Sequence, residues 1–221
     1  MSFLDRYRSP ADLPQRLPVF PLSGALLLPR AELPLNVFEP RYLDMMVDAM
    51  AGDRLIGMIQ PQPEQSSDRP ALLQVGCAGR ITSYAETPDD RVLMTLTGVC
   101  RFTVVEELDA GTAYRQVVAD YHPFAVDLVS DLGASEVNRP ALLKAFREYL
   151  QANDMNADWE QVDAASTEVL VNTLSLLAPY AAREKQALLE APDLKTRSEV
   201  LIALTEMALA RTARHSDRRL Q

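Results

Sequence analysis

Short apolar runs separated by prolines, glycines and charged turns fill the first half of the chain. Val, Ile, Thr and Phe are frequent in these runs, and polar turns such as residues 87–90 divide them. Beyond residue 50, we predict strands at residues 55–60, 72–86, 92–98, 99–108 and 113–122. The glycines within residues 72–86 predict that this strand is bulged or bent. Short strands with tight turns of this kind predict a small, strongly bent sheet or partial barrel.

The stretch of residues 17–46 is rich in proline and predicts a strand, a corner, a second strand and a helix. Proline fixes its own φ and donates no hydrogen bond, so it favours strand ends, edges and turns. Pro40 suits the first turn of a helix, where its missing N–H would have no partner. Helical spacing and a C-terminal stop at Gly52 support that helix, whose apolar residues are Leu43, Met46, Val47 and Met50.

From about residue 137 onward, apolar residues recur at helical spacing. We predict a helix beginning at Pro140, others over residues 163–177 and 181–190, and a fourth with Asp193 as its N-cap. One face of the second helix is expected to carry Val169, Leu170, Thr173, Leu174 and Leu177.

The predicted fold class is therefore α+β, with an N-terminal β-rich bent sheet or partial barrel followed by a C-terminal α-helical bundle. The predicted divisions are an N-terminal arm (1–15), a β-rich subdomain (16–122), a connector (123–136), an α-helical subdomain (137–215) and a tail (216–221).

The composition is that of a globular protein, with 48% hydrophobic and 24% charged residues among 221. A net charge of −9 argues against a general nucleic-acid or anionic-membrane binder, which needs a basic field. The last residues nevertheless carry a basic group of Arg211, Arg214, Arg218 and Arg219. This group is either a solvated helix end, where cations favour the helix dipole, or a contact for an acidic partner.

Two cysteines, Cys77 and Cys100, lie in predicted strands among apolar neighbours. They predict free buried thiols in a reducing compartment and no disulfide framework. The first ten residues carry charges where a signal peptide needs an apolar core, and no apolar run here is long enough to span a bilayer. We expect a cytoplasmic protein.

Four short motifs, in order along the chain, carry a family resemblance. Residues 18–42 contain PVFPL, then LP, PL and FEPRY; residues 75–81 read VGCAGRI, residues 96–102 read LTGVCRF, and residues 182–190 read AREKQALLE. Together these motifs resemble the N-terminal substrate-binding domain of the ATP-dependent protease Lon, a domain related to one in cereblon. The resemblance covers roughly residues 16–210. It implies a Lon N-terminal domain-like fold and a role in binding polypeptide substrates.

Catalytic motifs of Lon do not accompany this resemblance. A phosphate-binding loop needs a glycine-rich stretch that ends in Lys and Ser or Thr, and none of the three lysines follows one. Lys195 and Ser198 share helical spacing, but nothing in the sequence lowers the lysine pKa, so we interpret the pair as a coincidence. The two histidines, His122 and His215, form no metal motif. We expect no catalytic residues, cofactor or metal.

A peptide-binding strip is predicted at Leu26, Leu27 and Leu28. An extended backbone sends alternate side chains to opposite faces, so Leu27 would point away from a core that holds Leu26 and Leu28. Leu27 then packs either internally between the two halves or against a client, by edge pairing or apolar contact.

A second candidate site is the polar cluster at the strand-to-helix corner, formed by Phe38, Glu39, Pro40, Arg41 and Tyr42. We expect either or both of Glu39 and Arg41 to be partly buried there. A carboxylate can satisfy free N–H groups at a helix N-terminus, and an arginine can reach several carbonyl groups. The cluster is therefore either a structural clamp or a ligand contact.

Two functions remain open from the sequence. The first is a non-catalytic, stand-alone Lon-type module that binds unfolded or partly folded polypeptide clients, either for a protease or to hold them. The second is an adaptor or scaffold that binds one folded partner or itself. A hydrolase has no sequence support.

The purified protein is expected neither to hydrolyse ATP nor to cleave casein, because the sequence lacks a phosphate-binding loop and a nucleophile–base pair. Phosphate release and peptide release are the measurements. Turnover that stays with the protein through repeated chromatography would contradict this expectation.

Overall fold

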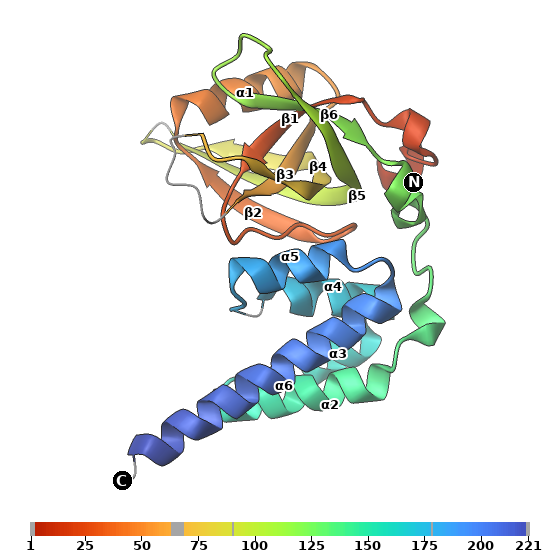
Figure 1. Cartoon of the computed structure of the whole chain (residues 1–221), viewed down its shortest axis with the longest axis vertical. Helices are drawn as coiled ribbons and strands as arrows, with labels where there is room; N and C mark the ends of the chain where they lie inside the picture. The colour runs from red at the N-terminus through yellow and green to blue at the C-terminus, as the bar shows by residue number, and fades with distance from the viewer. Residues whose placement is uncertain (1–2, 63–68, 90, 178, 220–221) are drawn as a thin grey trace. The chain divides into compact units, whose positions relative to one another are not determined.

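The computed structural model describes residues 3–62, 69–89, 91–177 and 179–219, with side chains from residue 4 to residue 211 within these ranges. The chain forms two compact units, Met1–Ser130 and Asp131–Gln221, which divide inside the segment predicted as a connector. We call them the β-unit and the helical unit and describe each by itself (Figure 1). The α+β class is confirmed.

Six strands and one α-helix make the β-unit. The strands are β1 (Arg16–Pro21), β2 (Glu32–Val37), β3 (Leu55–Pro61), β4 (Leu72–Glu86), β5 (Val92–Leu108) and β6 (Arg115–Asp120), and the helix is α1 (Pro40–Ala51). Their order in the sheet is β2-β5-β4-β3-β1-β6, and β6 also pairs with β5. Five strands therefore close into a barrel, and β2 extends it at one side (Figure 1). Among the strand pairs formed by the described residues, β1–β3 is parallel and the others are antiparallel.

Strand β5 connects the two ends of this sheet. Its first half pairs with β2, from Val37 opposite Val92 to Glu32 opposite Thr97, and its second half pairs with β6. Strand β4 pairs with the other edge of β5 from Val75 to Glu86, which is nearly the whole length of β4. This pairing contains the predicted bulges. The prediction of two strands here, meeting at residues 98 and 99, was wrong.

Gly98 misled that prediction because it is a point of close approach and not a turn. A Cβ atom at Gly98 would lie 2.0 Å from the carbonyl oxygen of Leu28. The backbone of residues 28–31 crosses here, where Arg30 donates its N–H to the Gly98 oxygen at 2.8 Å and Gly98 donates to Ala31 at 2.9 Å. Glycine is therefore required for packing inside a continuous strand.

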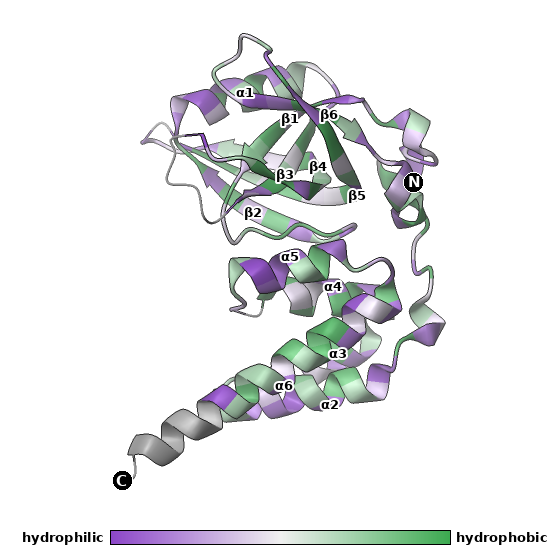
Figure 2. Ribbon diagram, viewed as in Figure 1, coloured by the Kyte–Doolittle hydropathy of each residue, from purple (hydrophilic) through white to green (hydrophobic). Residues whose placement is uncertain are grey.

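Phe102 on β5 occupies the centre of the barrel core. Its side chain is fully buried, and Cβ atoms at Gly57 and Gly76 would lie 2.9 and 2.5 Å from its ring. The core also includes Tyr7 and Leu13, so part of the segment predicted as a loosely held arm packs against the sheet. Hydrophobic residues accordingly dominate the central strands (Figure 2).

A buried ion pair joins β5 to the segment that follows β6. Arg101 and Asp127 have side chains only 1% and 6% exposed. The guanidinium Nε and Nη2 donate to the two carboxylate oxygens at 2.8 Å each, and the Arg101 backbone N–H donates to Oδ2 at 3.0 Å. Phe124 lies beneath the guanidinium, 4.4 Å from it. Asp127 belongs to the 3₁₀ helix His122–Leu128, which this pair fixes to the barrel.

Both cysteines are buried and free, as predicted. Cys77 lies opposite Arg101 and Cys100 opposite Ala78 on neighbouring strands. Adjacent residues of a strand alternate between faces, so the two thiols point to opposite sides of the sheet. Burial raises the pKa of the Cys100 thiol, which keeps it protonated.

The helical unit contains α2 (Arg139–Ala152), α3 (Trp159–Ala164), α4 (Thr167–Leu177), α5 (Ala182–Glu190) and α6 (Leu194–Arg219). Asp193 caps α6 as predicted, accepting from the Thr196 N–H at 2.7 Å. The single helix predicted over 163–177 is wrong, because α3 ends at Ala164 and α4 begins at Thr167. Arg139 holds this break by donating to the carbonyl oxygens of Val162 and Ala165 at 3.0 and 2.8 Å.

Helix α6 contacts α2, α4 and α5, and it lies beside α2 over much of its length (Figure 1). Leu170, Val171 and Leu174 of α4 are buried. Val169 and Leu177, which were predicted to share one face with Leu170 and Leu174, are 47% and 72% exposed. Most of the basic group at residues 211–219 lies beyond the range in which side chains are described. Within that range, the Arg211 guanidinium lies 3.5 Å from the Glu184 carboxylate. No helix in the described ranges combines the length and apolar character needed to cross a membrane.

Asp127→Ala is expected to lower the free energy of unfolding by about 3–5 kcal/mol, because it leaves a buried guanidinium without its carboxylate. Chemical denaturation measures this loss. The double variant Arg101→Met, Asp127→Leu should lose less than the sum of the two single variants.

Asp89→Ala is the matched control, because the Arg91–Asp89 pair is exposed and should contribute far less than the buried pair. Equal losses for Asp127→Ala and Asp89→Ala would show that the buried pair does not hold the barrel.

Candidate polypeptide-binding site

The predicted leucine strip lies in the core of the β-unit. Leu26, Leu27 and Leu28 are 3%, 1% and 0% exposed. Leu27 packs over β4, where its Cδ2 would lie 2.6 Å from a Cβ atom at Gly79. The alternation argument failed because this segment is not a regular strand, so neighbouring side chains need not point to opposite faces. Burial of all three side chains gives the strip no surface for a client.

The corner cluster is divided between core and surface. Pro40 begins α1 and Tyr42 is buried, with its ring 4.0 Å from that of Phe20. Glu39 and Arg41 do pair, at 2.7 Å, but their side chains are 44% and 48% exposed. Glu39 makes no capping hydrogen bond to α1, since its carboxylate binds Arg41 instead. Glu39 and Arg41 are therefore partly buried and paired with each other, and their ion pair is not enclosed in the core.

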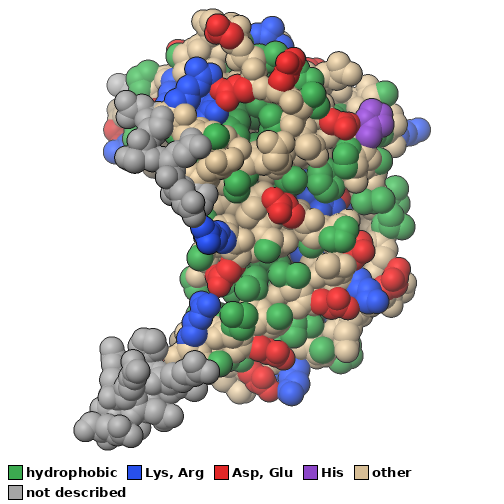
Figure 3. Space-filling model, viewed as in Figure 1, with side chains coloured by type: hydrophobic (Ala, Val, Ile, Leu, Met, Phe, Trp, Pro, Cys, Tyr) green, Lys and Arg blue, Asp and Glu red, His purple; other side chains and the backbone are tan. Residues whose placement is uncertain are grey.

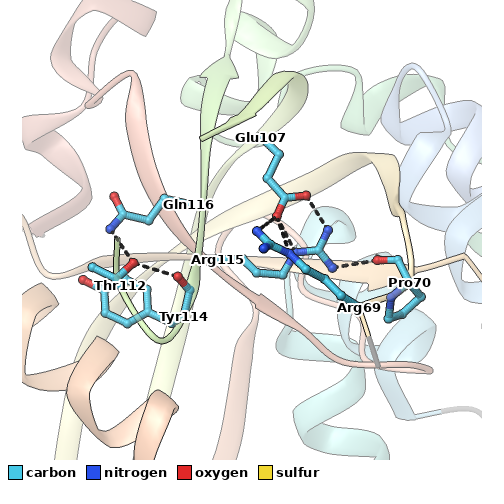
Figure 4. Close-up of polar contacts among 7 residues, drawn as sticks. All are labelled: Arg69, Pro70, Glu107, Thr112, Tyr114, Arg115 and Gln116. Atoms are coloured by element: carbon cyan, nitrogen blue, oxygen red, sulfur yellow. Dashed lines mark hydrogen bonds and ion pairs between the residues drawn. The ribbon is translucent and has the colours of Figure 1, made fainter. Parts of the chain in front are cut away.

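Arg41 and Tyr42 line a cleft of about 310 Å³ in the β-unit, together with Arg69, Tyr114 and Arg115. Figure 4 shows how Glu107 accepts from both Arg69 and Arg115. Arg115 also donates to the carbonyl oxygen of Pro70 at 2.7 Å. These contacts hold the pKa of Glu107 below its usual value, with Arg115 as the main cause.

Tyr114 closes another side of this cleft. Its hydroxyl donates to the Asp48 carboxylate at 2.7 Å. Burial and this bond raise the pKa of Tyr114 to about 12. The polar groups of the cleft are thus largely engaged with each other, which is typical of a structural network.

An apolar pocket of about 400 Å³ opens in the helical unit. Four segments line it: α2, the loop that follows α2, the region from the end of α4 to Tyr180, and α6. Its side chains are Leu142, Phe146, Tyr149, Leu150, Met155, Asn156, Ala157, Leu174, Leu177, Pro179, Tyr180, Leu201 and Thr205. The volume falls within the range of small-ligand sites, and the lining is mostly apolar with a few polar groups.

Leu177 and Met155 are large apolar side chains of this lining that are exposed, at 72% and 52%. Exposed apolar side chains that border a concave site provide a surface suited to binding. Tyr180 and Thr205 supply polar groups, with their hydroxyl oxygens 2.7 Å apart. Thr205 also donates to the Leu201 oxygen at 2.7 Å, and burial raises the pKa of Tyr180. The pocket can therefore hold an apolar group and offer it one hydrogen-bonding edge.

The edge of strand β2 is another candidate site in the β-unit, where a polypeptide could pair as an added strand. Strand β2 is the end strand of the sheet order, so one of its edges has no partner strand among the described residues. Pro34 lies opposite Thr95 in the middle of β2 and donates no N–H. A proline on an edge strand opposes pairing with another chain. The apolar pocket is therefore the better candidate site.

A family model, the ATP-dependent protease La (LON) substrate-binding domain, matches residues 16–206. The chain belongs to this family, as the sequence motifs predicted. Lon protease 2 of Myxococcus xanthus is 29% identical over 209 residues, which cover 87% of this chain and 24% of that protein. A Lon protease of Heliobacterium modesticaldum is 26% identical and covers 85% of this chain and 23% of that protein. The chain thus spans about a quarter of the length of these curated relatives.

Solved structures show the same fold. The crystal structure of a Lon N-terminal domain protein from Xanthomonas campestris has a TM-score of 0.61 and 23% identity, over 85% of this chain and 97% of that one. The N-terminal domain of a Mycobacterium avium complex Lon protease has a TM-score of 0.59 and 17% identity, over 86% and 98% of the two chains. Only the substrate-binding domain of Lon is matched here.

Tyr42→Ala is expected to lower the free energy of unfolding by about 3–5 kcal/mol, since it removes a buried aromatic ring. Glu39→Ala and Arg41→Ala should each cost less than about 1 kcal/mol, because their pair is half exposed. Thermal or chemical denaturation compares the three. A loss of several kcal/mol for Arg41→Ala would restore the clamp interpretation.

Proposed function

We propose that this protein is a non-catalytic module that binds unfolded or partly folded polypeptides through exposed apolar side chains. The apolar pocket of the helical unit receives such a side chain. Membership of a substrate-binding family supports the class of ligand, and the lining of the pocket supports the apolar chemistry.

The pocket is the single observation that carries this proposal. Three helices and the loop after α2 supply aromatic and aliphatic walls, with Tyr180 and Thr205 as the hydrogen-bonding groups. Leu177 and Met155 would become buried when a client side chain enters. Transfer of their apolar surface out of water would then favour binding.

The expected affinity for one side chain is low. An aromatic side chain buries roughly 150–250 Å², which contributes about 4–6 kcal/mol at about 25 cal/mol per Å². Without any ordering cost, this gain corresponds to a dissociation constant of roughly tens of micromolar to millimolar. Ordering of the client opposes the gain, so one contact binds more weakly than this range. Weak and reversible contacts of this kind suit a module that accepts many clients.

Net charge agrees with this selectivity. Acidic and basic side chains are interspersed on the face shown in Figure 3, and the whole chain carries a net charge of −9. Such a surface gives little general attraction for nucleic acid, so apolar contact is the better supported basis for binding.

The test uses a labelled unfolded protein, reduced and carboxymethylated α-lactalbumin, and its fluorescence anisotropy. Wild type should bind it, and Leu177→Glu should weaken binding by about fivefold or more, because a charge enters the mouth of the pocket. Leu177 is 72% exposed, so this variant should retain its melting temperature.

Val169→Glu is the matched control on the same helix. Val169 is 47% exposed and lies outside the pocket lining, so binding should not change. A folded Leu177→Glu variant that binds as well as wild type would remove this pocket as the client site. A panel of unrelated unfolded clients would show whether binding is general or restricted to one partner.

A further inference from the structure

A polar pocket of about 470 Å³ lies in the β-unit, and its lining shares no residue with the cleft at Arg41 or the apolar pocket. It brings together the N-terminal segment, the turn between α1 and β3, and strand β4. Its charged and hydroxyl side chains are Arg6, Tyr7, Asp12, Asp53, Arg54 and Arg80.

Arg80 ties the N-terminal segment to the turn. Its Nη1 donates to the Tyr7 hydroxyl at 3.0 Å and to the Asp53 carbonyl oxygen at 3.0 Å. Tyr7 is itself 92% buried as part of the barrel core, since only 8% of it is exposed. The three arginines therefore reach one pocket from segments that are each fixed to the sheet.

Arg54 occupies a backbone position that normally favours glycine. Its φ is +60°. The backbone is held there from both sides, because its N–H donates to Ala49 at 2.9 Å and its carbonyl oxygen accepts from Ile81 at 2.9 Å. Glycine would adopt this conformation at lower cost. What the arginine adds is a guanidinium group in the pocket lining.

The charges of the lining leave an excess of positive charge. Three guanidinium groups face two carboxylates, and Arg6 and Arg54 form no ion pair within the described residues. The Asp12 carboxylate is engaged in its own turn, accepting from the N–H groups of Arg8 and Ser9 at 2.9 and 2.8 Å. These bonds hold the pKa of Asp12 below its usual value.

We propose that this pocket binds a phosphate group carried by a larger molecule. A guanidinium offers a planar fork of donors that matches phosphate oxygens, and several forks together favour a dianion over a single carboxylate. The Tyr7 hydroxyl lies beside Arg80 as a further polar contact. The cavity exceeds the size of a bare phosphate ion, so it leaves space for the group to which the phosphate is attached. This group is either a small metabolite or a phosphorylated side chain.

Isothermal titration calorimetry with inorganic phosphate and with a phosphoserine peptide tests the proposal. The unphosphorylated peptide and acetate are the reference ligands, at equal ionic strength. Arg54→Gly should weaken phosphate binding by about tenfold or more, because it removes one charge-assisted contact. The same variant should melt at or above the wild-type temperature in chloride, since glycine relaxes the backbone.

Arg91→Gln is the control for net charge, because it removes one cation from an exposed site in the same unit. It should leave phosphate binding unchanged. If the phosphoserine peptide binds and inorganic phosphate does not, the ligand is a phosphorylated polypeptide. If both bind with equal affinity, the pocket recognises the phosphate group itself, which identifies a small phosphorylated metabolite as the ligand. The proposal is overturned if neither phosphate ligand binds, or if acetate binds with the same affinity as phosphate. It is also overturned if Arg91→Gln weakens phosphate binding as much as Arg54→Gly does.

Discussion

The buried ion pair between Arg101 and Asp127 is the interaction on which the β-unit depends. Two charges removed from water cost several kcal/mol each, and only close bidentate geometry offsets that cost. The structure provides it: both carboxylate oxygens accept from the guanidinium, and the backbone N–H of Arg101 adds a third bond. Arg30 donates to the backbone oxygen of Asp127 at 2.6 Å, so the segment that crosses Gly98 is tied to the same residue. One aspartate thus fixes the middle of β5, the 3₁₀ helix after β6 and the crossing segment together.

Local rules predicted much of the fold. Local backbone chemistry, set by residues close together in the sequence, predicts three features of the fold. These are the start of α1 at Pro40, the start of α6 after Asp193 and the bulges of β4. Tertiary contacts decided the rest. Gly98 was interpreted from the sequence as a break between two strands. In the fold, glycine is needed there because the carbonyl group of Leu28 leaves no space for a Cβ atom. Asp127 lies in the segment predicted as a connector, and only the fold brings it to Arg101.

The candidate site shows the same limit. The leucine strip was an attractive surface from the sequence because alternation assumes a regular strand, and the chain at residues 26–28 is not one. The pocket was not predicted, since its walls come from segments as distant as Leu142 and Thr205. Each of these residues is typical of a helix interior when taken alone. Exposed apolar side chains occur both at the pocket, as at Leu177, and away from it, as at Val169, so only the fold shows which of them border a cavity.

Barrel closure also has a consequence for the synthesis of this protein. Strand β1 is made first but takes β6 as one of its two partners, and Arg16 contacts Gln116 across 100 residues of sequence. At roughly 5–20 residues per second, β1 waits about 5–20 s on the ribosome for this partner. During that interval it presents an unpaired edge with apolar side chains, which is the kind of segment that aggregates. A newly made copy of this module is thus, for some seconds, similar to the polypeptides that we propose it binds.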